Sequence, residues 1–138
     1  MDYTGLSEEF LQTVYRLYRI GVQKQLNSAV QGEAFALHFI AQHDGAVVPS
    51  DIEGAMGVSS ARIATVLNGL ENKAFVTRQI DPADRRRTII RLTPLGEEQA
   101  AASADHLLGL AKKLLEFLGE EDAANYVRIM GRLADKFD

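Results

Sequence analysis

The stretch LENKAFVTRQIDPADRRRTIIRLTPLG, residues 70–96, carries the pattern that decides the fold. Over residues 76–80, and again over residues 88–92, apolar and polar side chains alternate. This period of two is typical of strands with one buried face. A polar, proline-containing segment at residues 81–84 separates the two runs, so we predict a β-hairpin over residues 75–93.

Two helices are expected after the hairpin. Thr93 is a good N-cap and Pro94 suits the first position of a helix, and the alanine- and leucine-rich segment continues to about Leu118. Gly119 breaks this helix, and the acids of residues 120–122 suit the positive end of a last helix. Five apolar side chains share one side of this last helix: Tyr126, Val127, Met130, Leu133 and Phe137.

A short helix, a glycine turn and an amphipathic helix precede the hairpin. Residues 50–53, Ser-Asp-Ile-Glu, form a capping-box pattern that predicts a helix start, and Gly57 ends this brief helix. Ser59 then offers a second N-cap. The helix that follows is expected to run to about Lys73 and to bury a face made of Ile63, Val66, Leu67 and Leu70.

The N-terminal part of the chain predicts two more helices. Residues 6–26 form one predicted helix, capped by Ser7, with two apolar stripes, although a single stripe is enough to dock a helix on its own domain. We infer that this helix has a second surface to cover. A shorter helix over residues 31–43 is expected to end at Asp44 and Gly45, a typical stop signal.

Charge is distributed unevenly along the chain. The net charge of the 138 residues is −4, which disfavours a nucleic-acid-binding protein on average, because phosphate contacts need lysine and arginine. Residues 45–95, however, hold seven basic and five acidic residues, a net charge of +2 that leaves −6 for the remainder. The middle of the chain is therefore basic and its flanks are acidic.

Residue types exclude several classes of site. The chain has no cysteine, so disulfides, thiol nucleophiles and zinc–thiolate sites are excluded. The N-terminal ten residues lack the basic and apolar regions of a signal peptide, and no apolar run reaches the roughly 20 residues of a membrane span. We expect a soluble, cytoplasmic protein with no membrane partner.

The order of short helix, glycine turn, amphipathic helix and hairpin is that of a helix-turn-helix followed by a wing. Five side chains lie on the outer face of the amphipathic helix: Ser60, Ala61, Arg62, Thr65 and Asn68. Arginine can bond guanine, asparagine can bond adenine, and hydroxyl groups can bond base edges or phosphates. The alternative is that these are ordinary solvated positions.

The hairpin concentrates positive charge at its tip. Residues 85–87 are three consecutive arginines, and Arg78 and Arg91 lie on the strands. A tip arginine can enter a narrow minor groove, where the negative potential is strongest. Asp84 precedes Arg86 by two residues, close enough for a bidentate pair that holds the guanidinium in one pose. The alternative is a solvated charge run, and the position directly after a helix-turn-helix argues against it.

Residues 50–96 resemble the winged helix of the MarR (multiple antibiotic resistance regulator) family. The matching segments are LENKAFV at 70–76, DPADRR at 81–86 and LTPLG at 92–96. The Asp-x-Arg of the wing followed by Leu-Thr-x-x-Gly is the most specific part, and the flanking helices fit the family's architecture. The resemblance implies a mainly α fold with a small β-hairpin wing (α+β), a winged helix-turn-helix with N- and C-terminal dimerisation helices.

The resemblance also implies how the chain is divided and what it does. Residues 1–30 and 94–138 are expected to form the dimerisation region, and residues 31–93 the DNA-binding lobe. The implied function is that of a sequence-specific regulator of transcription. It is expected to be a ligand-responsive repressor that binds a pseudo-palindromic operator in double-stranded DNA as a homodimer.

Contacts with DNA are carried over from the resemblance residue by residue. The outer-face residues Ser60, Arg62, Thr65 and Asn68 are implied to contact bases or phosphates. Arg86, supported by Asp84, is implied to enter the minor groove. The full set of candidate DNA-binding residues is Ser50, Ser59, Ser60, Ala61, Arg62, Thr65, Asn68, Arg78, Asp84, Arg85, Arg86 and Arg87.

Two positions depart from the family pattern. Ala74 stands where the family usually has glycine, which implies a slightly strained or differently shaped turn. Gly69 lies inside the amphipathic helix, where it costs up to about 1 kcal/mol relative to alanine. A longer polar residue is common at this position in the family, and Gly69 leaves a gap in its place. The resemblance therefore leaves the contacts with DNA near Gly69 undetermined.

A small amphipathic or aromatic effector is a further implied partner, bound between the dimerisation helices and the lobe. The candidate lining residues are Tyr15, Tyr18, His38 and Phe39; the alternative is that these side chains are core. The three histidines suggest a metal site, but His38 and His43 are five residues apart, a poor fit to one helical face. We expect no metal and no cofactor.

Two other classes of protein are alternatives to a DNA-binding regulator. An enzyme needs a nucleophile with a base, paired carboxylates, a phosphate loop or a metal cluster, and the sequence has neither a Gly-x-Ser-x-Gly motif nor a glycine-rich loop. We therefore expect no catalysis. The other alternative is a protein-interaction dimer that has lost DNA binding, and the arginines of the tip argue against it.

Overall fold

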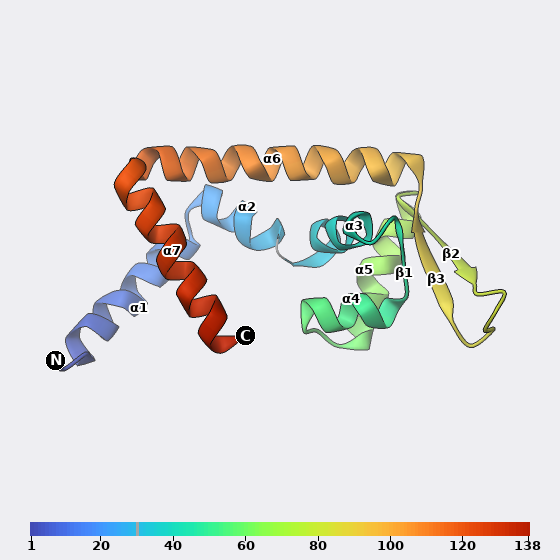
Figure 1. The fold of residues 1–138 in the computed structure, drawn as a ribbon, viewed down its shortest axis with the longest axis horizontal. Coiled ribbons are helices and arrows are strands. Elements are labelled where there is room, and N and C mark those ends of the chain that lie inside the picture. Colours follow the sequence, from blue (N-terminus) through green and yellow to red (C-terminus); the bar gives the residue numbers. More distant parts are fainter. Residues whose placement is uncertain (30) are drawn as a thin grey trace.

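The structure is a computed structural model that describes residues 1–29 and 31–138. Figure 1 shows an elongated molecule with one long helix, α6, along its top. Beneath one end of α6 lie α1, α2 and α7; beneath the other lie α3, α4, α5 and the sheet. The bounds are α1 Thr4–Tyr18, α2 Gly21–Ala29, α3 Gly32–Gln42, β1 Ala46–Val47, α4 Pro49–Met56, α5 Ser60–Asn72, β2 Val76–Ile80, β3 Thr88–Leu92, α6 Pro94–Leu118 and α7 Glu120–Phe137. The predicted mainly α fold with a small wing is confirmed.

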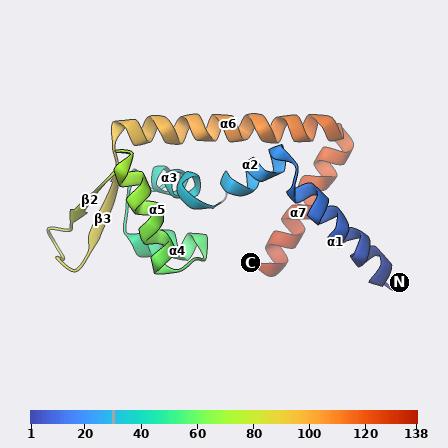
Figure 2. The same cartoon turned by 180° about the vertical axis from the view of Figure 1, so that it is seen from behind.

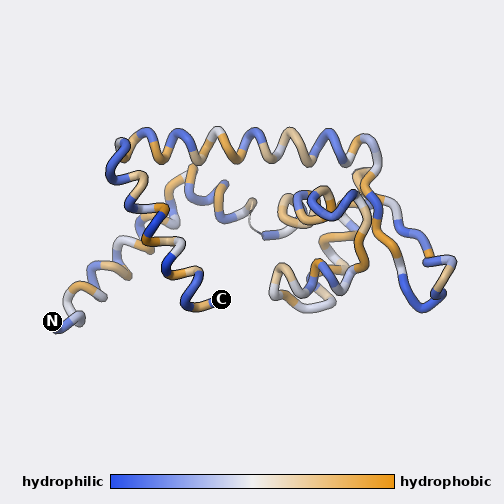
Figure 3. Tube along the Cα trace, in the orientation of Figure 1, coloured by the Kyte–Doolittle hydropathy of each residue, from blue (hydrophilic) through white to orange (hydrophobic). Residues whose placement is uncertain are grey.

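The winged lobe, made of α3, α4, α5 and the three strands, contains the hydrophobic core. Figure 3 shows hydrophobic segments of these elements meeting inside the lobe. Large apolar residues of α3, α4, α5 and the sheet are at most 2% exposed, among them Ile40, Ile52, Ile63, Leu70 and Ile90. Burial of each such side chain contributes roughly 1.5–3 kcal/mol relative to its exposure to water. The lobe therefore holds α5 and the wing on a rigid base.

The sheet has three antiparallel strands in the order β1-β3-β2. The predicted hairpin is confirmed as β2 and β3, with Arg78 opposite Ile90 and Val76 opposite Leu92. The strand β1 was not predicted; it pairs with β3 through Val47 and Ile90. Two residues are too few to show an alternation of polar and apolar side chains, so the sequence carried no signal for it.

The predicted single helix over residues 6–26 is wrong, because the chain forms two helices there. The N–H groups of Arg19 and Ile20 donate to the carbonyls three residues earlier, at 3.2 and 3.1 Å. Such tightened bonds are common where a helix ends. Gly21, a poor helix former, begins α2, so the chain changes direction between α1 and α2 (Figure 1).

Two of the predicted helix starts are also wrong. The helix α1 begins before Ser7, and the carboxylate of Asp2 accepts from the Thr4 N–H at 3.0 Å. The helix α4 begins at Pro49, and the carboxylate of Asp51 accepts from the Val48 N–H at 3.2 Å. The predicted cap by Ser50 and Glu53 therefore does not form. Proline at the first helical position moves the start by fixing its own φ angle.

The two other predicted N-caps are confirmed. Ser59 Oγ accepts from the Arg62 N–H at 3.3 Å and starts α5. Thr93 Oγ1 accepts from the Gly96 N–H at 3.0 Å and starts α6. The Thr93 hydroxyl also donates to the Ala74 carbonyl at 2.6 Å. Thr93 thus joins the start of α6 to the end of α5.

The junction between α5, the sheet and α6 explains two residues of the family-like pattern. Ala74 has a φ of +61°, in the left-handed region where a Cβ is unfavourable, and the Phe75 N–H donates to the Leu70 carbonyl at 2.9 Å, as in a Schellman motif. A Cβ on Gly96 would lie 2.0 Å from the Phe75 carbonyl oxygen. Glycine at 96 therefore allows α6 to approach the lobe, whereas alanine at 74 is strained.

None of the helices in residues 1–29 and 31–138 combines the length and the hydrophobicity that a membrane span requires.

Candidate nucleic-acid interface

The helix α5 presents a polar outer face to solvent. Ile63, Val66, Leu67 and Leu70 are buried as predicted, whereas the five outer-face candidates at positions 60, 61, 62, 65 and 68 are exposed. Figure 2 shows α5 at the surface of the lobe beside the wing. A helix that is anchored on one face and exposed on the other is suited to lie in a major groove.

Hydroxyl groups at the start of α5 already have partners in the lobe. Ser60 Oγ donates to Glu53 Oε1 of α4 at 2.6 Å, and Thr65 Oγ1 donates to the Ala61 carbonyl at 3.1 Å. The Ser59 side chain serves as the N-cap. These bonds fix the hydroxyl oxygens, which retain lone pairs for accepting a hydrogen bond from a base or a bridging water. Ser50, on α4, and Arg62 are exposed.

Asn68 and Arg78, both candidate DNA contacts, bond each other. Arg78 Nη2 donates to Asn68 Oδ1 at 2.6 Å, and Arg78 Nε lies 3.2 Å from Glu71 Oε2. This cluster was not predicted from the sequence. The alternation of residues 76–80 did contain a signal. Arg78 is two residues from the buried Val76, so both side chains lie on the same face of the strand, and Arg78 points toward α5.

Asp84 and Arg86 form the predicted pair at the tip of the wing. Arg86 Nε donates to Asp84 Oδ1 at 3.1 Å and Arg86 Nη2 donates to Asp84 Oδ2 at 3.4 Å. The Arg86 side chain is nevertheless 92% exposed, against 33% for Asp84. The hydrogen bonds from Arg86 hold the pKa of Asp84 below its ordinary value. Asp84 therefore stays ionised at neutral pH and orients a guanidinium that remains open to solvent.

Backbone bonds close the loop that carries the arginines. The Asp81 N–H donates to the Arg87 carbonyl at 2.9 Å, and the Arg87 N–H donates to the Asp84 carbonyl at 2.9 Å. The Ala83 N–H donates to the Asp81 carboxylate at 2.9 Å. Arg85 and Arg87 are exposed beside Arg86. The loop is thus a defined turn that presents three cations beyond the end of the sheet.

The space at Gly69 is filled by a side chain of α3. A Cβ on Gly69 would lie 2.1 Å from Glu33 Oε1, and the Glu33 carboxylate pairs with Lys73 at the end of α5. Gly69 therefore faces α3 and not the outer face. The glycine permits a link between α3 and α5, which accounts for its place inside this helix.

The four candidate effector contacts lie in different surroundings. His38 lines a cavity of about 620 Å³ between α2, α3 and α6, which is mostly apolar and also includes Gln25 and His106. Phe39 packs against the lobe core and stacks on Phe35. Tyr15 and Tyr18 are exposed on α1. The structure therefore does not bring these four side chains together within one protomer.

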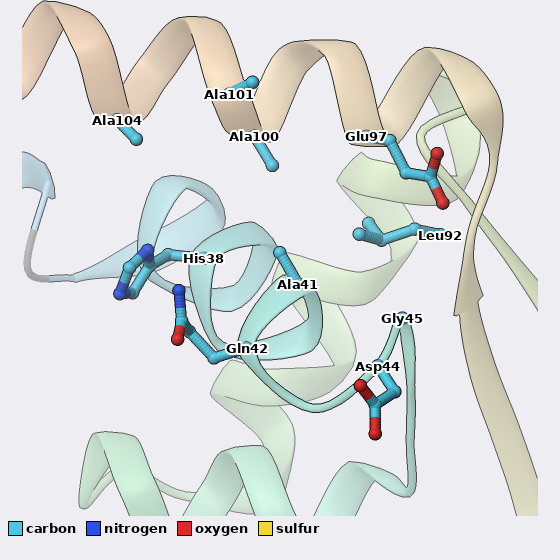
Figure 4. A pocket seen from close by; sticks show the side chains of 10 residues that line it. All are labelled: His38, Ala41, Gln42, Asp44, Gly45, Leu92, Glu97, Ala100, Ala101 and Ala104. Atoms are coloured by element: carbon cyan, nitrogen blue, oxygen red, sulfur yellow. The ribbon is translucent and has the colours of Figure 1, made fainter.

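A second, smaller cavity of about 370 Å³ lies where α3 meets the start of α6 (Figure 4). Ala100 and Ala104 of α6 face His38 and Ala41 of α3, and the carboxylate of Glu97 lies at the other end. His38 borders both cavities.

The histidines have local partners. His43 Nδ1 donates to the Phe39 carbonyl at 2.7 Å and its ring stacks on Phe39, and His106 Nε2 donates to Gln25 Oε1 at 3.0 Å. Within the part of the chain that the structure describes, no group of three or more histidine or acidic side chains could hold a metal ion.

Comparisons with known proteins show which family the chain resembles. The model of the MarR family matches residues 25–87. The HTH-type transcriptional regulator YwhA of Bacillus subtilis is 29% identical over 91% of the chain and 88% of its own length.

Solved structures share the fold. A mutant MarR of E. coli, complexed with operator DNA, gives a TM-score of 0.70 at 16% identity, covering 96% of this chain and 99% of that one. BpsR of Bordetella bronchiseptica, whose DNA binding is regulated by 6-hydroxynicotinic acid, gives 0.68 at 19% identity, covering 93% and 92%. The matching family and the named relative are regulators of transcription and not enzymes. The chain is thus similar to the MarR family over residues 25–87 and shares its fold with a solved member of that family.

Proposed function

We propose that the protein is a homodimeric repressor that binds a pseudo-palindromic operator in double-stranded DNA and responds to a small effector. The observation that carries the DNA-binding part is the exposed Arg86, held by Asp84 in a closed loop beside the polar face of α5. A rigidly presented arginine next to a groove-sized helix can contact two adjacent grooves of one duplex.

The placement of the two elements supports this mode of binding. Figure 1 shows that the start of α5 and the tip of the wing both lie on the side of the lobe away from α6. The side chains of Ser60, Ala61, Arg62 and Thr65 lie on the first two turns of α5, where a recognition helix contacts bases. We propose that this segment reads the major groove and that Arg86 enters the flanking minor groove.

The outer helices support a homodimer. Among the described residues, none of α1 or α7 is buried. Large apolar side chains on these helices are exposed, including Phe10, Val127, Met130 and Leu133. Exposed apolar surface of this extent marks an interaction site. A second copy would cover both helices and place two lobes on half-sites about 10 base pairs apart, or a multiple of that.

The cavity between α2, α3 and α6 supports an effector site. Its volume of about 620 Å³ lies within the range of small-molecule pockets. Its apolar wall with a few polar groups suits an amphipathic or aromatic compound. The regulation of BpsR by 6-hydroxynicotinic acid makes a small aromatic compound a sensible first class of effector to test.

Selection of bound fragments from the source genome tests the proposal. We expect the purified protein to enrich a small set of duplexes that share two inverted half-sites, and its affinity for them to fall steeply with salt, because neutralised phosphates release counterions. Addition of aromatic acids to such a complex, followed by fluorescence anisotropy, would reveal an effector. Equal binding of genomic and random duplexes at low ionic strength would contradict the proposal.

A further inference from the structure

Asn68 is restricted in what it can offer to a base. Arg78 Nη2 donates to its side-chain amide at 2.6 Å. A guanidinium has donors and no acceptor, so the atom it meets is the carbonyl oxygen. The carbonyl oxygen keeps a second lone pair, but the guanidinium cation beside it disfavours the approach of a further donor, so the NH₂ group is the part of the exposed Asn68 amide best placed to bond a ligand. Asn68 therefore presents donors to the groove.

Arg78 reaches from β2 to two side chains of α5, through one hydrogen bond and one ion pair, although its buried Nε makes no hydrogen bond among the described residues. It lies in the middle of β2, opposite the buried Ile90, and its side chain is only 30% exposed. Its Nε lies 3.2 Å from Glu71 Oε2, and Glu71 follows Asn68 by one helical turn, on the same side of α5. The guanidinium is thus fixed between α5 and the wing.

We propose that Arg78 is a positioning residue that turns Asn68 into a reader of guanine in place of adenine. This inference rests on the proposed DNA-binding function. Recognition of adenine by asparagine needs the carbonyl oxygen to accept from the base amino group while the NH₂ donates to N7. The carbonyl of Asn68 already bonds a cation, which repels a further donor. Guanine presents two acceptors, N7 and O6, on the same edge, and these match the donors of Asn68.

Selection from randomised duplexes with the full-length protein and matched variants tests this inference. Asn68→Ala identifies the base pair in each half-site whose preference depends on Asn68. At that pair we expect the unaltered protein to prefer guanine over adenine by about tenfold. Arg78→Met frees the carbonyl of Asn68 and should shift the preference to adenine, whereas Arg78→Lys, which keeps a cationic donor, should retain guanine.

Arg91→Met is the matched control. It removes the same charge from the neighbouring strand, but Arg91 is opposite Thr77, on the other face of the sheet from Arg78. We expect it to weaken binding to all duplexes by a similar factor and to leave the selected base unchanged. A general loss of charge or of stability therefore cannot imitate the shift expected for Arg78→Met.

The outcomes separate this inference from the function on which it rests. If the unaltered protein enriches no duplex, the proposed function is overturned and the inference with it. If it enriches a duplex with adenine at the Asn68-dependent pair, or if no pair depends on Asn68, only the inference is overturned.

A modified base tests the assignment with the unaltered protein, once Asn68→Ala has identified the base pair. Guanine at the Asn68-dependent pair is replaced by 7-deazaguanine, which lacks the N7 acceptor, and the unaltered protein is titrated with both duplexes. We expect about a tenfold loss of affinity. Equal affinity for the two duplexes would overturn the assignment of Asn68 as a donor to guanine.

Discussion

The winged lobe and the outer helices differ in how completely one chain buries its apolar side chains. In the lobe, side chains from α3, α4, α5 and the sheet close a core around Ile63 and Leu70. The outer helices α1 and α7 expose theirs, and the side chain of Leu133 is 55% exposed. One chain therefore buries the apolar side chains of the lobe by itself, whereas the apolar side chains of α1 and α7 are buried only if another surface covers them.

This difference separates two tasks of the molecule. A closed core holds α5 and the wing at a fixed distance, which reading of adjacent grooves requires. An open pair of helices suits association of two chains, and the spacing of the two lobes then depends on that association. Substitutions in one region at a time therefore test how far the two regions depend on each other.

The largest effect is expected from Leu133→Asp in α7. Two copies of the new carboxylate would be buried at the proposed dimer interface, which is strongly unfavourable, so we expect monomers at micromolar concentration and a loss of operator affinity of about a hundredfold or more. Sedimentation velocity and anisotropy measure the two effects. Lys112→Gln, which changes the net charge equally at a polar position of α6, is the control. A variant that stays dimeric would contradict the proposed interface.

The second-largest effect is expected when a buried side chain of the lobe is truncated, and it is compared with truncation of an exposed side chain of α7. Ile63→Ala leaves a cavity in the closed core and should lower the free energy of unfolding by about 2–5 kcal/mol. Val127→Ala removes an exposed methyl pair, so its effect should depend on protein concentration, because only the dimer would bury it. Chemical denaturation at several concentrations distinguishes the two. A large, concentration-independent effect of Val127→Ala would show that α7 packs within its own chain.

Arg86→Ala tests the wing alone. The side chain is 92% exposed, so its removal should leave the melting temperature within about one degree. Operator affinity should fall about ten- to a hundredfold, because each dimer loses two groove contacts. Glu98→Ala on α6 serves as an exposed control. Unaltered affinity would remove the tip arginine from the binding mechanism.

The smallest effect is expected at the turn after α5. Ala74 has a φ of +61°, and glycine adopts this conformation without steric cost. We expect Ala74→Gly to stabilise the lobe by about 0.5–1 kcal/mol. Ala64→Gly, in the interior of the same helix, should destabilise it by up to about 1 kcal/mol. A shift of the same sign in both variants would mean that the strain at Ala74 is relieved in another way.

The sequence was sufficient to predict those elements in which polar and apolar residues recur with a clear period. The alternation of polar and apolar residues predicted β2 and β3, and the helical spacing of Ile63, Val66 and Leu70 predicted the buried face of α5. Local side-chain interactions were predicted equally well. Ser59 and Thr93 cap helices as expected, and Asp84 pairs with Arg86 two residues away.

Features that depend on contacts between distant residues were not predicted. The Arg78–Asn68 bond joins a strand to a helix, and the Glu33 carboxylate that fills the space at Gly69 comes from α3. The break between α1 and α2 was missed because the apolar stripes continue across it. Periodicity places Arg78 on the same face of the strand as Val76, and Gly21 is a poor helix former, but neither signal identifies a distant partner or fixes where a helix ends.

Hydroxyl-radical footprinting of the dimer on an enriched duplex tests the central claim most directly. If α5 and the wing of each chain contact adjacent grooves, protection should occur in two half-sites about 10 base pairs apart, or a multiple of that. Arg86→Ala should lose the minor-groove protection at the outer flanks and keep the rest. A single protected patch, or a pattern that Arg86→Ala does not alter, would contradict this mode of binding.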